Sequence, residues 1–534
     1  MPEPLRCVPE STIIVGWDFS TSAVKALAFN LRGNVVARSW FKNDVWTDYT
    51  PAPANRECFI DSGNREINLM QLEGQARASA REIEALLEEE GFADEWLAAG
   101  ISATHHTAGW IDANHNPIRR AICWDDQTLA RYHAIGLERL GGPDAVRKLI
   151  GGPWAVRYSL SHLVKDGTTF SKKDWQRAEW MMGHGPLAAG YLTGKFGVTS
   201  VSSAASTGIL NLKTDQWQYA MLGAVGDPDL QTKIASCLPK VVETFRPIGK
   251  LAGSEWMDLV RIELPKGMEF QRPLLFPTLD DQAAGLVGGG ATQPGELAII
   301  LGTSAVVNSS ASAAPTTDSL DAMKLGWDNA YLWMRCYSNG AGFAESVEPV
   351  KTRIEVEPEA ERLPPGCDGV SVLPFLNSEP SLGINQKRIE WTGDATSKPV
   401  RVRAAYEAIA YLIALGVRAH QDAGQKITRI TVSGGLGKSK LMCEILASVL
   451  AGVLPRPLPL VRLVSDEGSA LGAAVLALAG LEATMRAERG IEEPFTIADA
   501  TAKLVHEQDR VSARGEWIEG YRRLLAEFEK RIHL

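Results

Sequence analysis

The start of the chain alternates short runs of apolar, often β-branched side chains with small polar segments. Such runs occupy residues 12–17 (TIIVGW), 24–30 (VKALAFN) and 34–40 (NVVARSW). Each run has the length and composition of a strand, and the segments between them contain Asp, Ser, Thr and Gly, which favour chain reversal. The pattern predicts that the chain opens with a sheet of hairpins.

Helical patterns follow in the rest of the N-terminal half. Residues 66–90 predict one helix, which ends in three consecutive glutamates before a glycine. A buried strand is expected at 97–102, shortly before His105 and His106. The middle of the chain, residues 125–270, is helix-rich, and its pattern does not divide it further.

The second half alternates strands and helices, which is typical of an α/β unit. A new unit is expected to start near Pro273 and a helical tail near Thr501. The strands are predicted at 298–301, 305–309, 427–433 and 461–464, and the helices at 402–421, 439–451 and 466–479. The last of these helices carries small residues, which permit close packing.

Length and composition narrow the class of protein. At 534 residues the chain is too long for one ordinary core, so two domains are expected. The hydrophobic fraction of 45% and the charged fraction of 22% are typical of a soluble globular protein. The net charge of −9, without a long basic run, argues against nucleic acid as a partner.

The chain also lacks the usual signals for a membrane or for export. Its longest apolar runs, such as Ile13–Val15 and Leu297–Leu301, are too short to span a bilayer. The first ten residues contain no apolar stretch, and the seven cysteines show no CxxC spacing. We therefore expect a cytoplasmic protein without a membrane partner.

Three separated segments combine acidic or small residues with turns that suit phosphate. In the first, Asp18 ends a buried strand and a Ser-Thr-Ser turn reverses the chain. Turn amides and hydroxyls can bind phosphate oxygens, and a carboxylate can bind Mg²⁺. An ordinary hairpin turn is the alternative interpretation.

The second segment, residues 275–304, contains Asp280 and Asp281 followed by a strand and the turn LGTS. A carboxylate that takes a hydroxyl proton, together with a phosphate-sized turn, is what phosphoryl transfer to an alcohol requires. Gly302 would let the backbone approach a phosphate, and Thr303 offers a donor. An ordinary β-turn again remains open.

The third segment, residues 430–450, has a strand that ends in Gly434 and Gly435, where a flat ligand could lie on bare backbone. Its GLGKS string is similar to a Walker A loop, but Val432 occupies the position of the first glycine, so a P-loop is excluded. A purely structural strand-turn-helix is the alternative.

The order of these segments resembles that of the FGGY carbohydrate kinases, relatives of xylulokinase and glycerol kinase. Residues 18–25 (DFSTSAVK) match a DxGTxSxK-type opening. Residues 103–109 (ATHHTAG) loosely match a GQMHG-type sugar segment, with His106 on the family histidine. Residues 124–126 (WDD) match the start of WNDxR.

The C-terminal half matches more closely. Residues 281–288 (DQAAGLVG) match GDxAAGxxG, residues 301–304 match LGTS, and residues 434–480 nearly preserve a GGxxxS…EGxALGAAxLA ending. The resemblance covers about residues 12–480.

This resemblance implies an α/β fold with two ribonuclease H-like (actin-like ATPase) lobes and a central interlobe cleft. Residues 11–272 would form the N-terminal lobe with the sugar-binding segment and a phosphate loop. Residues 273–490 would form the nucleotide-binding C-terminal lobe, and residues 491–534 a helical tail. The implied activity is ATP-dependent, Mg²⁺-dependent phosphorylation of a sugar hydroxyl.

The resemblance also assigns roles to residues. Asp281 is implied as the general base and Asp18 as the ligand of Mg²⁺, whereas Asp280 is expected to cap the following helix and His105 to be structural. The sugar is expected to contact His106, Trp124, Asp125, Asp281 and Gln282. ATP is expected to contact Thr21, Ser22, Lys25, Gly302, Thr303, Gly434, Gly435 and Glu444.

The chain departs from the family mainly on the sugar side. The departures are Ser20 for the loop glycine, Asp280 for the glycine before the catalytic acid, Thr128 for an arginine and Ser448 for an aspartate. A GERTP-like stretch is reduced to NSEPSLG at 377–383, which keeps Glu379.

These departures leave several functions open. A pentulose such as xylulose or ribulose is the first expected acceptor, and glycerol, erythritol or another ketose are alternatives. A nucleotide-binding protein without catalysis and a kinase-like protein with decayed activity remain other interpretations. A homodimer is compatible with the resemblance.

Overall fold

The computed structural model describes residues 4–47, 63–251, 272–317, 319–384 and 386–533. They form two compact units, each built from separate stretches of the chain. Unit 1 comprises Met1–Gly288, Ala322–Tyr331 and Ser469–Leu504, and unit 2 comprises Gly289–Asp321, Leu332–Gly468 and Val505–Leu534. The sequence domains proposed above divide the chain linearly, and they stay a prediction.

The main sheet of unit 1 has the strand order β14-β15-β6-β1-β2-β3, with β16 also paired to β6. Strands β1 to β3 form an antiparallel meander, and β6 runs parallel to β1. The predicted opening sheet of hairpins is therefore confirmed. The strands are β1 (Ile13–Phe19), β2 (Ala23–Asn30), β3 (Val35–Lys42), β6 (Trp96–Ala103), β14 (Gly249–Lys250), β15 (Leu274–Leu275) and β16 (Leu279–Asp280).

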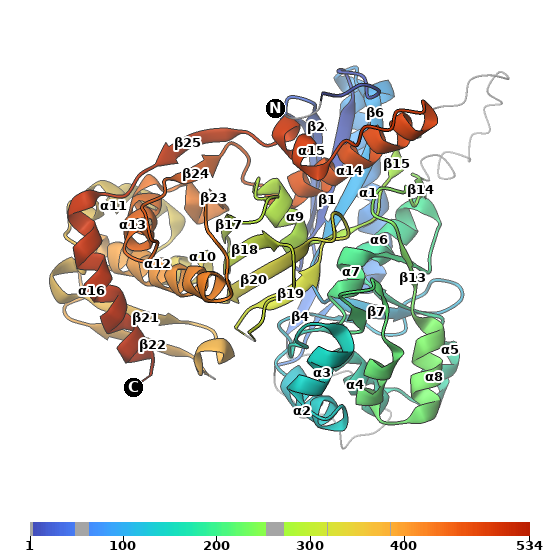
Figure 1. Cartoon of the computed structure of the whole chain (residues 1–534), viewed down its shortest axis with the longest axis horizontal. Coiled ribbons are helices and arrows are strands. Elements are labelled where there is room, and N and C mark those ends of the chain that lie inside the picture. Colours follow the sequence, from blue (N-terminus) through green and yellow to red (C-terminus); the bar gives the residue numbers. More distant parts are fainter. Residues whose placement is uncertain (1–3, 48–62, 252–271, 318, 385, 534) are drawn as a thin grey trace. The chain divides into compact units, whose positions relative to one another are not determined.

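Helix α14 (Gly468–Glu488) packs against this sheet at very short range (Figure 1). A Cβ added to Gly16 in β1 would lie 1.9 Å from the Ala470 carbonyl oxygen, and one on Gly100 in β6 would lie 2.0 Å from that of Ala473. Only glycine permits this approach. The predicted close packing of the small residues in α14 is confirmed. By length and composition α14 could cross a membrane, but it is mostly buried in the structure.

Unit 1 also contains a smaller sheet with the order β4-β5-β8-β7-β9. The predicted helix at 66–90 is α1 (Leu69–Glu89), which begins later because Asn68 caps the Met70 amide. The short strands are β4 (Val45–Thr47), β5 (Arg65–Ile67), β7 (Ala108–Ile111), β8 (Ala121–Ile122), β9 (Trp180–Gly183), β10 (Val198–Ser200), β11 (Leu210–Asn211), β12 (Gln216–Trp217), β13 (Lys240–Val242) and β19 (Asp321–Lys324).

Seven further helices of unit 1 come from the middle of the chain, namely α2 (Leu129–Arg139), α3 (Pro143–Ile150), α4 (Ser159–Thr169), α5 (Lys172–Arg177), α6 (His184–Thr193), α7 (Val201–Ala205) and α8 (Pro228–Cys237). Unit 1 also contains α9 (Asp281–Gly288), α14 and α15 (Ile497–Leu504). The positions of α2 to α8 confirm the helix-rich character expected for residues 125–270 as far as residue 251, where the described part of that region ends.

Unit 2 is built on a sheet whose neighbouring strands include β20-β18-β17-β23-β24-β25. Strand β17 is antiparallel to β18 and parallel to β23. The strands are β17 (Glu296–Leu301), β18 (Ala305–Ala311), β20 (Tyr331–Tyr337), β23 (Arg429–Ser433), β24 (Leu460–Leu463) and β25 (Glu507–Val511), with a separate pair β21 (Ser371–Phe375) and β22 (Arg388–Thr392).

The core of unit 2 forms between this sheet and its helices. Helix α12 is buried along most of its length, and α16 adds Trp517, Tyr521 and Leu525 to the core. The helices are α10 (Ala341–Val347), α11 (Val350–Ala360), α12 (Lys398–Asp422), α13 (Lys440–Ala451) and α16 (Gly515–Ile532). The predicted helical tail is helical only in part, because β25 lies between α15, which belongs to unit 1, and α16, which belongs to unit 2.

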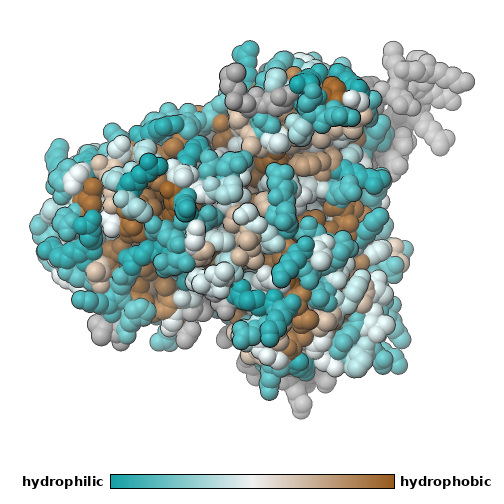
Figure 2. Space-filling view, viewed as in Figure 1, coloured by the Kyte–Doolittle hydropathy of each residue, from teal (hydrophilic) through white to brown (hydrophobic). Residues whose placement is uncertain are grey.

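The surface has the polarity expected from the composition. Hydrophilic side chains cover most of the face shown in Figure 2, and brown apolar patches are small and interrupted. Large exposed apolar side chains, such as Trp40, Met70 and Ile354, are scattered over separate elements.

Candidate active site

Two adjacent carboxylates stand at the junction of a strand and a helix in unit 1. Asp280 is the last residue of β16, and Asp281 is the first residue of α9. The buried Asp280 accepts hydrogen bonds at Oδ1 from the backbone N–H groups of Gln282 (3.0 Å) and Ala283 (2.9 Å). These bonds satisfy two free amides at the helix start. The prediction that Asp280 caps this helix is confirmed.

Asp281 is partly buried among other acidic groups. Its Oδ1 accepts a hydrogen bond from the Gln282 side-chain amide (3.2 Å). Burial raises the pKa of Asp281 well above its usual range, and the charges of Asp280 and Asp18 raise it further. A carboxylate with a raised pKa holds a proton more tightly, which is the property that a general base needs.

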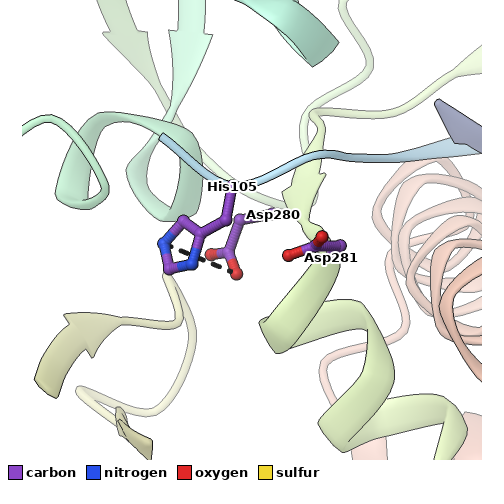
Figure 3. A group of neighbouring side chains, drawn as sticks. All are labelled: His105, Asp280 and Asp281. Atoms are coloured by element: carbon purple, nitrogen blue, oxygen red, sulfur yellow. Dashed lines mark ion pairs between the residues drawn. The ribbon is translucent and has the colours of Figure 1, made fainter. Parts of the chain in front are cut away.

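Two stacked histidines lie beside this acid pair, in the turn after β6. The ring centroids of His105 and His106 are 3.5 Å apart, and His106 also stacks on Tyr158 at 4.4 Å. The Nε2 atom of His105 lies 3.9 Å from Oδ1 of Asp280 (Figure 3). The structure therefore brings the predicted sugar-binding histidine and the predicted base to one part of unit 1.

Both imidazoles are neutral near pH 7. Burial lowers the pKa of His105 to about 4 and that of His106 well below its usual range. The Nδ1 atom of His106 lies 2.6 Å from the carbonyl oxygen of Ser206, which can only accept, so Nδ1 carries the hydrogen. Its Nε2 is then an acceptor, and it has no hydrogen-bond partner among the described residues. His106 can thus receive a hydrogen bond from a ligand hydroxyl.

The Trp124-Asp125-Asp126 segment divides into two kinds of residue. Asp126 is buried and supports the local structure, because it receives the Thr128 amide (2.8 Å). Asp125 is partly exposed and pairs with Arg65 (3.2 Å). Burial raises the pKa of Asp125, although Arg65 opposes this effect. Within the described ranges no hydrogen bond or ion pair joins Trp124 or Asp125 to the acid pair, so their sugar-binding role stays a prediction.

The predicted phosphate and metal residues of unit 1 occupy the β1–β2 hairpin. Asp18 lies opposite Lys25 in the register, and the Thr21 hydroxyl lies 3.1 Å from that of Thr104, in the turn before His105. The charge of Asp18 acts on Asp281. Mg²⁺ prefers one or two carboxylates with phosphates and waters as ligands, and two neighbouring carboxylates fit that preference.

The predicted ATP turns of unit 2 lie at one edge of its sheet. The Gly302–Ser304 turn follows β17, and Gly434 follows its parallel neighbour β23. Gly434 has φ of 89°, and a Cβ there would lie 2.7 Å from the Leu301 carbonyl. A Cβ on Gly435 would meet no atom within 4 Å. Packing therefore requires glycine at position 434, whereas the backbone at Gly435 is open.

A buried carboxylate supports the first of these turns through the chain that follows β20. Glu379 accepts hydrogen bonds from the Ser338 amide and from the Asn339 side chain (2.8 Å). The next residue, Gly340, donates its N–H to the Thr303 carbonyl (3.0 Å). A Cβ on Gly340 would lie 2.4 Å from the Ser304 carbonyl carbon. Glu379 therefore positions the Gly302–Ser304 turn indirectly.

Glu444 was predicted to border ATP. In the structure it lies on α13, is nearly buried and forms a hydrogen-bonded ion pair with Arg514. Its carboxylate is thus engaged within unit 2, and its ATP-binding role stays a prediction.

Two residues of this neighbourhood were not found from the sequence. Ser202 donates to the Asp280 carboxylate (2.7 Å), and Tyr158 stacks on His106. They come from the helix-rich middle region, where no motif marks them. Only the tertiary structure brings them to the turn after β6.

Comparison with known protein families covers both halves of the chain. The model of the FGGY family of carbohydrate kinases, N-terminal domain, matches residues 13–259, and that of the C-terminal domain matches residues 297–481. The chain belongs to the FGGY family of carbohydrate kinases. It is therefore a sugar kinase, and kinases of this family use ATP.

FGGY kinases with different acceptors are about equally similar to the chain. It is 24% identical to a xylulose kinase of Haemophilus influenzae over 389 residues (71% of this chain, 74% of the relative). It is 24% identical to a gluconokinase of Bacillus subtilis over 489 residues (88% and 87%), and 25% identical to a glycerol kinase of Methylorubrum extorquens over 501 residues (86% and 88%). These similarities do not select an acceptor.

The fold agrees with that of solved FGGY kinases. The crystal structure of gluconate kinase from Lactobacillus acidophilus matches with a TM-score of 0.77 and 19% sequence identity, covering 98% of both chains. The expected α/β fold of the actin-like ATPase type is thus confirmed.

Proposed function

We propose that this FGGY kinase transfers the γ-phosphate of ATP to a hydroxyl of a pentulose, such as xylulose or ribulose. The observation that carries the proposal is Asp281, a partly buried carboxylate with a raised pKa beside a neutral His106 with an acceptor nitrogen. A base and a hydroxyl-binding group are what an alcohol acceptor requires. Another ketose or a polyol such as glycerol or erythritol is the alternative acceptor.

Asp281 would accept the proton of the attacking hydroxyl. Its carboxylate starts a capped helix, so the Asp280 cap holds it in place. Phosphoryl transfer passes through a loose transition state, in which alignment and charge neutralisation supply most of the catalysis. His106, Gln282, Trp124 and Asp125 would orient the acceptor.

The ATP phosphates would bind bare backbone and short hydroxyl side chains. In unit 2 these are Gly302, Thr303, Gly434 and Gly435, with Glu444 near the nucleoside; in unit 1 they are Thr21, Ser22 and Lys25. Asp18, with the neighbouring Asp281, fits Mg²⁺, which when bound neutralises phosphate charge. We propose a cytoplasmic enzyme without nucleic-acid or membrane partners, and a homodimer is the assembly to test.

A panel of acceptors tests this function. ADP release would be followed with Mg-ATP and xylulose, ribulose, gluconate, glycerol or erythritol. Turnover with a pentulose is expected. If only another acceptor is turned over, that compound replaces the pentulose as the proposed substrate. ATP binding without turnover of any acceptor would indicate a non-catalytic nucleotide-binding protein.

Asp281→Asn tests the base directly. We expect kcat to fall by about a thousandfold, because the proton acceptor is lost while the Asn carbonyl still receives the Gln282 amide. ATP binding, measured by calorimetry, should change little. Asp94→Asn, an exposed acid of unit 1, is the control and should keep full activity. Wild-type kcat in Asp281→Asn would remove the assignment.

A further inference from the structure

His105 lies in the neighbourhood of Asp280 and Asp281, but it takes no part in the helix cap or in the proposed base chemistry. One ligand atom from each of His105, Asp280 and Asp281 lies within 4.8 Å of the other two. Figure 3 shows the Asp280 carboxylate beside the His105 imidazole, with the Asp281 carboxylate on the other side of Asp280, although the residues come from the β6 turn and from the β16–α9 junction.

The Nε2 atom of His105 lies near the Asp280 carboxylate and lacks a hydrogen bond in the described residues. His105 is 5% exposed, and its Nε2 has no hydrogen-bond partner in the described residues. Its distance of 3.9 Å from Asp280 Oδ1 is too long for a hydrogen bond. The His106 ring stacks on it at 3.5 Å, which holds the imidazole in its orientation. A buried polar atom without a partner is costly unless a ligand completes it.

The distances suit a bound cation. Metal–ligand distances of about 2.0–2.4 Å place two ligands of one ion between about 2.8 and 4.8 Å apart, depending on their angle. One ligand atom from each of the three residues lies within 4.8 Å of the other two, which is compatible with this interval. A cation would also offset the repulsion between two adjacent carboxylates.

The surroundings of the two carboxylates resemble a second coordination shell. Asp280 receives the Ser202 hydroxyl at Oδ2 (2.7 Å) and two backbone amides at Oδ1, and Asp281 receives the Gln282 amide. Hydrogen bonds of this kind orient carboxylate ligands. The two amides use both lone pairs of Asp280 Oδ1, so Oδ2 is the oxygen that keeps a lone pair for an ion.

We propose that His105, Asp280 and Asp281 form a binding site for a divalent transition-metal ion of the Mn²⁺, Co²⁺ or Zn²⁺ class. The imidazole decides the class, because Mg²⁺ prefers oxygen ligands and imidazole favours transition metals. Such an ion occupies the carboxylate of Asp281. An ion bound there therefore inhibits phosphoryl transfer. This inhibition rests on the proposed function, whereas the binding of the ion does not depend on it.

Metal binding to the full-length, chelator-stripped protein tests the site. Co²⁺ is titrated by calorimetry and visible absorption in excess Mg²⁺. We expect one Co²⁺ ion to bind per chain, with absorption bands typical of nitrogen and oxygen ligands. His105→Ala and His105→Gln should lose this binding. His533→Ala removes an exposed histidine of unit 2 and should bind as the wild type does.

Three results would overturn the site: no Mg²⁺-resistant binding, binding that both His105 variants keep, or thiolate bands that indicate the cysteines. Asp280→Asn provides a second variant that keeps the helix cap but loses the anionic ligand, and binding should be lost there too. Thermal unfolding establishes that each variant is folded.

Inhibition is measured separately from binding. Zn²⁺ should inhibit ATP-dependent phosphorylation in the wild type, and His105→Gln should resist it. If the protein binds Co²⁺ but phosphorylates no acceptor, the proposed metal site stands and the proposed function is wrong. A kinase that is active and insensitive to Zn²⁺ and binds no Co²⁺ keeps the function and loses the site.

Discussion

At the scale of single residues, the candidate site depends on how one aspartate changes its neighbour. Asp280 caps α9 through two amides, and its charge adds to burial in raising the pKa of Asp281. The register of DQAAG was sufficient to predict the capping role of Asp280, because a capping residue directly precedes the first helical residue. The position of His105 opposite Asp280 was not predictable, since 175 residues separate them in the sequence.

Asp280→Asn should move the acid limb of the pH–rate profile. A base works only when it is deprotonated, so kcat/KM falls as pH falls through the raised pKa of Asp281. Removal of the neighbouring negative charge lowers that pKa, and the limb should shift to lower pH. Asn retains a carbonyl oxygen for the cap. The profile is measured with saturating Mg-ATP, and an unchanged midpoint would contradict the electrostatic role of Asp280.

At the scale of elements, two packing arrangements position the site. Helix α14 approaches β1 and β6 through glycines, and the Gly302–Ser304 turn is held from behind by the Ser338–Gly340 segment. The small residues of α14 were recognisable in the sequence. Glu379 was recognisable only as a remnant of a motif, because its partners Ser338 and Asn339 lie 40 or so residues upstream and no local pattern links them.

Gly100→Ala should destabilise the protein. The added methyl group would lie 2.0 Å from the Ala473 carbonyl oxygen, and neither β6 nor α14 can move freely. Overpacking of this kind costs about 1–3 kcal/mol of unfolding free energy. Gly74→Ala is the matched control, because Gly74 lies within α1 with no atom within 4 Å of its added Cβ. It should stabilise by up to about 1 kcal/mol. Urea unfolding compares the two variants, and equal effects would contradict the packing argument.

Glu379→Ala should weaken ATP binding more than catalysis. Loss of the carboxylate leaves the Ser338 and Asn339 donors without their acceptor, so the neighbouring turn at Gly302 loses its support. We expect the KM for ATP to rise about tenfold, equivalent to about 1.4 kcal/mol, with a smaller change in the KM for the acceptor. Glu379→Gln keeps an acceptor oxygen and should retain most of the affinity. A larger effect on the acceptor KM would remove this role.

At the scale of the whole molecule, each compact unit is assembled from stretches that are separated in the sequence. Local patterns predicted most strands and helices, and the motifs indicated the family. They did not indicate that residues 469–504 leave the C-terminal half to join unit 1. That assignment depends on non-local contacts, such as those of Ala470 with Gly16 and of Gly472 with Ala284, which a periodicity along the chain does not contain.

A buried carboxylate joins the N-terminal segment to this returning segment. Glu482 in α14 accepts the backbone amides of Arg6 (2.8 Å) and Val8 (2.8 Å) and the Arg486 guanidinium (2.8 Å). Arg486 in turn donates to the Pro4 carbonyl (2.9 Å). Burial alone would raise the pKa of the Glu482 carboxyl. The hydrogen bonds outweigh this effect, so the pKa is lowered.

Glu482→Gln should therefore lower the stability of unit 1. Removal of one partner from a buried charged pair costs about 3–5 kcal/mol of unfolding free energy. Glu488→Gln, an exposed acid of the same helix, is the control and should change little. Because the pKa of Glu482 is lowered in the folded state, its contribution exists at neutral pH and is lost as pH falls through that lowered value.

The pH dependence separates this explanation from a general packing defect. The stability difference between wild type and Glu482→Gln, from urea unfolding at several pH values, should be largest near pH 7 and shrink below the usual pKa of a glutamate. Removal of residues 1–8 should destabilise the wild type but add little in Glu482→Gln, since both changes break the same hydrogen bonds. Additive losses, or a difference that does not vary with pH, would show that Glu482 does not join the N-terminal segment to α14.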